Sequence, residues 1–230
     1  MMRGGITCLI PAYNEAARIG TVLAAVALHP AVDRVVVIDD GSSDGTAEVA
    51  AAAGAVVLRG PGNAGKTQAL LRGLATVQTR HVMLLDADLL GLTADDIARL
   101  IAPVMAGRAA ASISLRGNAP RTWRLLGVDY ISGERVFATD LLAGQEANLA
   151  RLPRFGFEVF LNRLLIARNA PVAVVPWPGV ASPSKAAKRG WLRGMADDAR
   201  MLSDIFHTIN PGEVVSQIAG LKRLNRAARA

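Results

Sequence analysis

The stretch Val82-Met83-Leu84-Leu85-Asp86-Ala87-Asp88 places four apolar residues directly before two carboxylates. A short apolar run of this kind is typical of a buried strand, so we expect both acids where that strand ends. Sites in open α/β sheets gather at the carboxyl ends of the strands. An Asp-x-Asp pair placed there can hold a divalent cation, and the cation can neutralise a diphosphate. Asp86 and Asp88 are therefore candidate ligands for Mg²⁺ or Mn²⁺, with two solvated acids at a strand end as the alternative.

Strands and helices are expected to alternate on both sides of this stretch. Short apolar runs rich in β-branched residues are separated by segments whose apolar residues recur with the period of a helix. Such repetition predicts an α/β protein with a mostly parallel sheet that helices cover on both faces. Thr93 stands three residues before Asp96, the spacing of a capping box at a helix start. The expected strands are residues 6–10, 35–38, 55–58, 82–85 and 110–115, and the expected helices are 16–27, 46–53, 67–77 and 95–104.

The second half of the chain carries a weaker pattern. Residues 116–129 are basic and contain Gly and Pro, which favours a loop or short helix that passes over the site. A helix is expected at 156–168 and a strand at 172–175, followed by a Pro-rich connection. Two further helices are expected at 186–208 and 212–228.

The net charge of +7 arises from 26 basic and 19 acidic side chains, and the excess is concentrated late in the chain. Residues 185–230 hold nine Lys and Arg against four acids. This basic segment could attract an anionic membrane, a phosphorylated molecule or nucleic acid. The alternative is a solvated helix face. Aromatic residues make up only 4%, so we expect no nucleic acid partner. The single Cys8 lies in an apolar run, which predicts a buried thiol and excludes an intrachain disulfide. No stretch approaches about 18 uninterrupted apolar residues, so we expect a cytoplasmic protein.

Two other nucleotide-binding patterns compete for the same segments. A dinucleotide-binding Rossmann site requires a Gly-rich turn after the first strand, whereas Pro11–Glu15 follows it here. Residues Gly60–Thr67 match the Walker A spacing and precede an apolar strand that ends in an acid. Against this interpretation, two strand–helix units come first, and it gives no role to Pro11–Glu15 or Asp39–Thr46. A P-loop NTPase stays as an alternative hypothesis.

Four segments, in order and at strand–helix spacing, resemble the family 2 glycosyltransferases of the GT-A fold. The resemblance covers about residues 5–105, and four such segments in sequence are far more specific than one. Farther on, three segments resemble the dolichyl-phosphate mannose synthase branch and its bacterial relatives, and they are also similar to glucosyl-3-phosphoglycerate synthases. The first four segments are Pro11–Glu15, Val37–Thr46, Asn63–Lys66 and Asp86–Asp88, and the later three are Ser132–Phe137, Phe155–Val159 and Ser184–Trp191.

The resemblance implies a nucleotide-sugar site at the strand ends. Tyr13 offers a flat face for a base, and Glu15 or Asp39 can accept hydrogen bonds from a base N–H. Gly41 and Ser42 turn the backbone toward the diphosphate, while Lys66 adds a positive charge there. A surface aromatic, helix-capping acids and a solvated lysine are the alternatives. The implied donor-binding residues are Pro11, Ala12, Tyr13, Glu15, Asp39, Gly41, Ser42, Lys66, Asp86, Ala87 and Asp88.

The resemblance also implies catalytic residues. Asp88 is the expected direct ligand of the metal, with Asp86 reaching the ribose or a metal-bound water. Glu158 is the expected base or acceptor ligand, with stabilisation of a helix N-terminus as its alternative. Arg135 is the preferred clamp for a phosphorylated acceptor, and for His207 a structural role is favoured over metal binding. Weaker candidates for the same clamp are Arg116, Arg121 and Arg124.

The implied activity is transfer of a hexose from a UDP- or GDP-sugar to a phosphorylated acceptor, either a polyprenyl phosphate or a small phosphorylated acid. A non-catalytic sugar-nucleotide-binding domain is a further alternative. The implied organisation is a glycosyltransferase domain at 1–185, with a nucleotide-binding half at 1–105 and an acceptor half at 106–185, and a basic helical extension at 186–230. A lipid-linked acceptor would bring the extension around Leu221-Lys222-Arg223-Leu224 to the inner face of the cell membrane as a peripheral contact. The sequence leaves the base, the sugar, the stereochemical outcome and a homodimer open.

Overall fold

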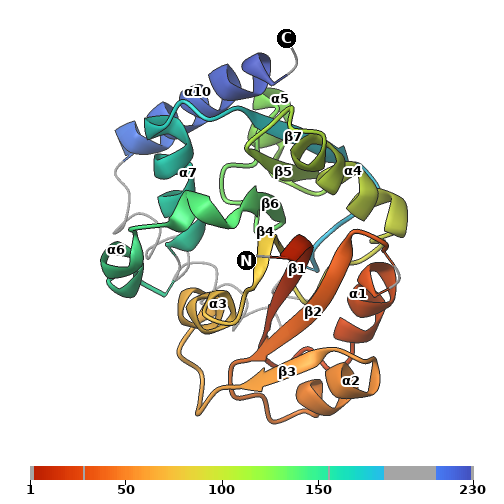
Figure 1. Ribbon diagram of the computed structural model, residues 1–230. Coiled ribbons are helices and arrows are strands. Elements are labelled where there is room, and N and C mark those ends of the chain that lie inside the picture. The colour runs from red at the N-terminus through yellow and green to blue at the C-terminus, as the bar shows by residue number, and fades with distance from the viewer. Residues whose placement is uncertain (1–2, 28, 155, 184–210, 229–230) are drawn as a thin grey trace.

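Seven strands in the part of the chain that the structure describes form one sheet (Figure 1). The computed structural model describes residues 3–27, 29–154, 156–183 and 211–228. The strands are β1 (Arg3–Ala12), β2 (Val32–Asp39), β3 (Val56–Arg59), β4 (Thr79–Leu84), β5 (Ala111–Arg116), β6 (Arg135–Ala138) and β7 (Val172–Trp177). Their order across the sheet is β3-β2-β1-β4-β6-β5-β7. Neighbouring strands run parallel, except that β6 lies antiparallel between β4 and β5.

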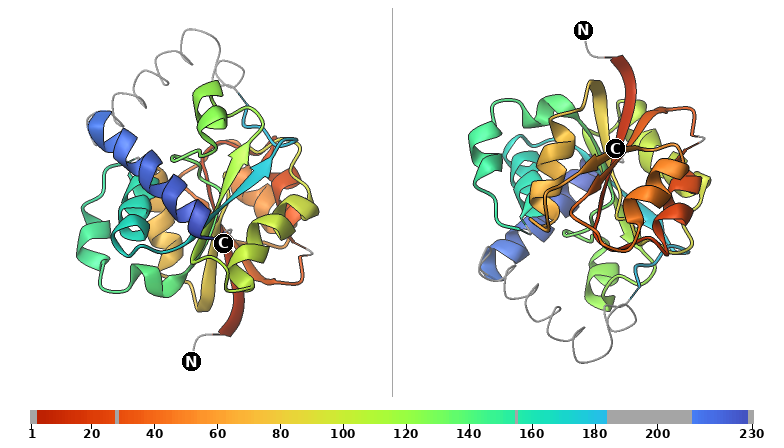
Figure 2. Two further views of the ribbon diagram at one scale, coloured as in Figure 1. Left: turned by 90° about the horizontal axis from the view of Figure 1, so that it is seen from above. Right: turned by 90° about the horizontal axis from the view of Figure 1, so that it is seen from below.

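Helices cover both faces of this sheet, as the sequence predicts (Figure 2). One apolar core joins the sheet to α1 and α4, and a second core on the other face joins it to α3, α7 and α10. The described helices are α1 (Ile19–Val26), α2 (Thr46–Ala52), α3 (Lys66–Leu74), α4 (Ala94–Met105), α5 (Arg121–Leu126), α6 (Glu146–Ala150), α7 (Phe157–Ala167) and α10 (Pro211–Ala227), with a 3₁₀ turn at Thr139–Leu142.

Successive residues of the central strands enter opposite cores. In β1, Cys8 and Ile10 pack on the side of α1 and α4, whereas Leu9 packs on the side of α3 and α7. In β4, Met83 and Leu84 divide in the same way. Both faces of these strands are buried, which is why they appear in the sequence as continuous apolar runs. The predicted burial of the Cys8 thiol is confirmed.

The predicted elements of the first half are confirmed, with boundaries that differ by a few residues. The capping box at the start of α4 is present, because the Asp96 amide donates to the Thr93 hydroxyl and the Thr93 amide donates to the Asp96 carboxylate. Sequence analysis did not predict β6. This strand has four residues and follows the polar segment Ser132–Glu134, so it lacks the length and periodicity of a recognisable strand.

The predicted C-terminal helix at 212–228 is confirmed as α10, and its two leucines pack into the core. Leu221 and Leu224 are buried in the core against α7 and β7. The Asn225 side chain also accepts a hydrogen bond from the Val174 amide of β7, at 3.0 Å. The expectation that Leu221–Leu224 meet a bilayer is therefore wrong for the two leucines. A helix that packs on a core and a helix that lies on a lipid surface have the same spacing of apolar residues, so the sequence does not distinguish them.

No helix in the described part of the chain is both long and apolar enough to cross a bilayer. The predicted helix at 186–208, the Ser184–Trp191 segment and His207 lie outside the described residues.

Replacing Leu224 with alanine tests how α10 is held. We expect Leu224→Ala to lower the free energy of unfolding by about 2–5 kcal/mol, because it removes buried methyl groups and leaves a cavity. Val215→Ala on the same helix is the control, since Val215 is 67% exposed and its loss should cost less than about 0.5 kcal/mol. Urea denaturation measures both, and equal effects would show that α10 does not dock as described.

Candidate active site

The loops after β1 and β2 are joined by reciprocal hydrogen bonds. Ala12 and Asp39 are partners in the parallel register, so both strands end at the same level. The Asn14 amide donates to the Ser42 hydroxyl at 2.9 Å, and the Ser43 amide donates to the Asn14 side-chain oxygen at 2.9 Å. The structure therefore brings together the Pro11–Glu15 and Asp39–Ser42 segments, as the sequence predicts.

Asp39 lies buried beneath this junction. Its carboxylate accepts a hydrogen bond from the Ser42 amide at 3.1 Å, which holds the turn that follows β2. Gly41 has a φ of +82° and lies so close to the next loop that a Cβ atom would come within 2.6 Å of the Gly62 Cα. A side chain at residue 41 would push the two loops apart. Glycine is therefore required by this packing as well as by the turn.

Asp40 fixes the loop at 60–65, a role that sequence analysis missed. The Gly65 amide donates to Asp40 Oδ2 at 2.7 Å, and the Arg72 guanidinium donates to Oδ1 at 2.7 Å. A charged acceptor makes both hydrogen bonds stronger than neutral ones. In the sequence, Asp40 is distinguished only by its position next to Asp39. Two neighbouring acids do not reveal which of them binds which loop.

The Gly60–Thr67 segment is folded differently from a phosphate-binding loop. A Walker A loop turns its amides and its final hydroxyl toward a nucleotide phosphate and its metal ion. Here the Gly65 amide donates to a carboxylate, and the Thr67 hydroxyl is buried and accepts a hydrogen bond from the Gly156 amide at 3.3 Å. The geometry does not support the P-loop interpretation.

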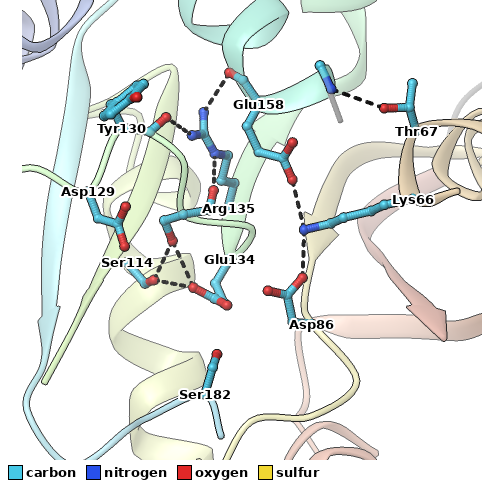
Figure 3. Close-up of polar contacts among 12 residues, drawn as sticks. Lys66, Thr67, Asp86, Ser114, Asp129, Tyr130, Glu134, Arg135, Glu158 and Ser182 are labelled. Atoms are coloured by element: carbon cyan, nitrogen blue, oxygen red, sulfur yellow. Dashed lines mark hydrogen bonds and ion pairs between the residues drawn. The ribbon is translucent and has the colours of Figure 1, made fainter. Parts of the chain in front are cut away.

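Lys66 is the centre of the site and joins three elements (Figure 3). Its Nζ lies 2.7 Å from Asp86 Oδ1 and 2.8 Å from Glu158 Oε1. Lys66 begins α3, Asp86 follows β4, and Glu158 lies in the first turn of α7. Gly133 borders this group, and a Cβ atom at that residue would come within 2.5 Å of Nζ. The ion pairs thus unite a residue of the predicted nucleotide-binding half with one of the predicted acceptor half.

Both members of the closer ion pair stay charged. Burial by itself would lower the pKa of Lys66, but the charges of Asp86 and Glu158 outweigh it and raise that pKa. Burial would likewise raise the pKa of Asp86, but the charges of Lys66 and Arg116 hold it below its usual range. Opposite charges at this distance favour the ionised form of each group. Asp86 is therefore available as an anion at neutral pH.

A second group of buried charges lies beside Asp86. Glu134 accepts hydrogen bonds from the hydroxyls of Ser114, at 2.6 Å, and Ser132, at 2.7 Å. Arg116 lies 3.5 Å from Glu134, and burial raises the pKa of Glu134 although this arginine opposes the shift. Sequence analysis included Glu134 only within the Ser132–Phe137 segment and assigned it no role. Its partners come from β5 and from the turn before β6, and such contacts leave no local pattern.

Arg135 does not have the role that the sequence suggests. Its side chain is fully buried, and its nitrogen atoms donate to the carbonyl oxygens of Ser132 and Tyr130, at 2.7 and 2.8 Å. A further bond of 2.6 Å goes to the side-chain oxygen of Asn162 on α7. A guanidinium engaged in this way holds the turn before β6 against α7 and cannot reach a phosphorylated acceptor. The acceptor-clamp assignment of Arg135 is therefore wrong in this structure.

The remaining predicted residues divide between the surface of the site and the core below it. Tyr13 and Asp88 are half-buried at the carboxyl ends of β1 and β4. The side chains of Ala12 and Ala87 pack in the core, so only the backbone of these residues can face a ligand. Glu15 is buried, and its amide donates to the Thr46 hydroxyl at 2.8 Å.

Asp86 and Asp88 fit a metal ion that a nucleotide also coordinates. Within the described residues, no three His, Cys, Asp or Glu side chains form a ready-made metal cage. Magnesium is commonly held by one or two carboxylates together with substrate phosphates, and this mode needs no cage. The pair of acids after β4 suits that mode, because Asp86 is held as an anion.

Solved structures with the same arrangement define the class of fold. Glucosyl-3-phosphoglycerate synthase from Mycobacterium tuberculosis, in complex with Mn²⁺, UDP and glucosyl-3-phosphoglycerate, superposes with a TM-score of 0.69 at 23% identity, over 89% of this chain and 80% of that chain. The same enzyme in complex with phosphoglyceric acid gives a TM-score of 0.68 at 25% identity, over 87% and 80%. The fold is the GT-A fold predicted from the sequence.

The sequence comparison then identifies the family. Residues 7–145, more than half of the chain, match the profile of glycosyl transferase family 2, and the chain belongs to this family. A curated relative, 4,4'-diaponeurosporenoate glycosyltransferase from Staphylococcus aureus, is 36% identical over 101 residues, which are 42% of this chain and 27% of that protein. The match thus spans little more than a quarter of the relative's length. Family membership confirms the prediction made from the four segments.

Replacing Arg135 separates a structural role from an acceptor role. We expect Arg135→Met to lower the free energy of unfolding by about 3–5 kcal/mol, because removal of a buried charged donor leaves its partners unpaired. Arg108→Met is the control, since Arg108 is exposed after α4 and loses the same charge. Urea denaturation compares the two variants. Wild-type stability in Arg135→Met, combined with a raised KM for the acceptor, would restore the clamp assignment.

Proposed function

We propose that this protein transfers a hexose from a UDP- or GDP-sugar to an anionic, phosphorylated acceptor, with Mg²⁺ or Mn²⁺ bound at Asp86 and Asp88. The observation that carries the proposal is the group formed by Lys66, Asp86 and Glu158, which lies between the donor loops and the acceptor half. Within this one group, Asp86 is an anion that could bind a metal ion, and Lys66 is a cation that could bind a diphosphate.

The donor site is assigned to the carboxyl ends of β1, β2 and β4. Tyr13 and Asp39 are assigned to the base, and they belong to the two loops that hydrogen bonds join. Transfer breaks the bond between the sugar C1 and the diphosphate oxygen, so negative charge develops on the leaving diphosphate. A bound metal ion would neutralise that charge, and Lys66 adds a positive charge next to Asp86, one of the two acids that would hold the ion.

The acceptor site is assigned to the region between Glu158 and Arg116. A hydroxyl acceptor needs a base to remove its proton, and we assign that role to Glu158 in the first turn of α7. A phosphate or carboxylate acceptor is already a nucleophile and needs a cation instead. With Arg135 buried, we assign that role to Arg116, whose side chain is partly exposed although Glu134 and Asp129 also lie beside it.

The names of the relatives support an anionic acceptor. The structural neighbour binds phosphoglyceric acid, and the curated relative is named for a carboxylate, 4,4'-diaponeurosporenoate. These two acceptors differ in size and polarity but share an acidic group. An anionic acceptor for this chain is consistent with both, whether soluble or lipid-linked.

A lipid-linked acceptor would bring α5 to an anionic membrane surface. This helix has no buried residue, and it exposes Arg121 and Arg124 together with Leu125, which is 87% exposed. Basic and apolar side chains in one exposed turn suit the interface of an anionic bilayer. We therefore place the proposed peripheral contact at α5, with the exposed Arg223 and Arg226 of α10 as a second basic surface.

A thermal-shift assay tests the donor site. We expect UDP or GDP with Mn²⁺ to raise the Tm of the protein by about 5–10 °C near saturation, while ATP has little effect. Asp88→Asn should abolish this shift because it removes the direct metal ligand. Asp95→Asn, an exposed acid at the start of α4, should preserve it. Stabilisation by ATP alone, or a full shift in Asp88→Asn, would contradict the proposal.

A further inference from the structure

The Lys66 ammonium is placed where it competes with a metal ion for the same carboxylate. It lies 2.7 Å from Asp86 Oδ1, and Asp86 is one of the two acids assigned to the metal. A divalent cation on Asp86 would repel an ammonium at this distance strongly, because the site is partly buried and water screens the charges incompletely. The ammonium and the metal ion therefore each weaken the binding of the other to the Asp86 carboxylate.

The Lys66 side chain is not sealed in the core, since 23% of it is exposed. Lys66 is the first residue of α3, so its side chain extends from a helix end on a flexible four-carbon stem. Gly133 packs closely against Nζ, so the ammonium can move only toward the exposed side of the group. A donor diphosphate at the strand ends is an anion within reach of this stem, on the proposal above.

We propose that Lys66 is an internal counter-ion of Asp86 and Glu158, which moves to the diphosphate when the donor binds and so leaves Asp86 to the metal ion. This inference rests on the proposed function. It predicts that metal and nucleotide bind cooperatively. The diphosphate draws the Lys66 ammonium away from the metal ion, and the metal ion drives the ammonium toward the diphosphate. Reciprocity of linked binding then requires that nucleotide strengthens metal binding by the same factor as metal strengthens nucleotide binding.

Titration calorimetry with Mn²⁺ alone, and with Mn²⁺ in the presence of UDP or GDP, tests the inference. In Lys66→Met we expect Mn²⁺ alone to bind about tenfold more tightly than in the wild type, because the competing charge is gone. The factor by which the nucleotide strengthens Mn²⁺ binding should fall by about the same amount. Lys66→Gln provides a second neutral variant that keeps a polar end, and circular dichroism confirms that both variants fold.

Arg108→Met is the matched control, because it removes one positive charge from an exposed turn after α4 and should behave like the wild type. The inference is overturned if both Lys66 variants bind Mn²⁺ alone no more tightly than the wild type. It is also overturned if the nucleotide strengthens Mn²⁺ binding by the same factor in the variants as in the wild type. In either case the proposed donor site stands. A wild-type protein that binds neither nucleotide with Mn²⁺ contradicts the proposed function and the inference together.

Discussion

A lysine ammonium shared by two carboxylates is the contact on which the arrangement of this site depends. Lys66, Asp86 and Glu158 belong to α3, the end of β4 and the start of α7, which are far apart in the sequence. Removing the ammonium would leave two partly buried anions facing each other, and such unpaired charges are costly. The same contact joins the loops assigned to the donor with the helix assigned to the acceptor. This contact therefore holds the two assigned regions together at one end of the sheet.

Carboxylates supply most of the framework around this contact. Asp39 holds its own turn, Asp40 holds the neighbouring loop, and Glu134 is held by two serine hydroxyls. Each is buried and accepts hydrogen bonds from backbone amides or hydroxyls, so its cost of desolvation is offset within the fold. On the proposed function, acids whose positions are set before the ligand arrives would favour binding of a metal ion and a diphosphate.

The sequence predicts the parts of this structure that depend on local patterns. Strands β1 and β4 appear as continuous apolar runs because both of their faces are buried, and the capping box of α4 depends on two residues three positions apart. Asp86 at a strand end and Lys66 at a helix start are both visible in the sequence. Their direct ion pair is not, since it joins residues of different elements. Arg135 shows the limit most clearly, because an arginine that bonds backbone carbonyls looks the same in sequence as one that binds a phosphate.

A crystal structure of the protein with Mn²⁺ and UDP, with manganese located by its anomalous scattering, tests the central claim most directly. The account predicts manganese at Asp88 and Asp86, with the diphosphate oxygens completing its coordination and the Lys66 ammonium on the diphosphate. A nucleotide held by the Gly60–Thr67 loop, with no manganese at the end of β4, would contradict it.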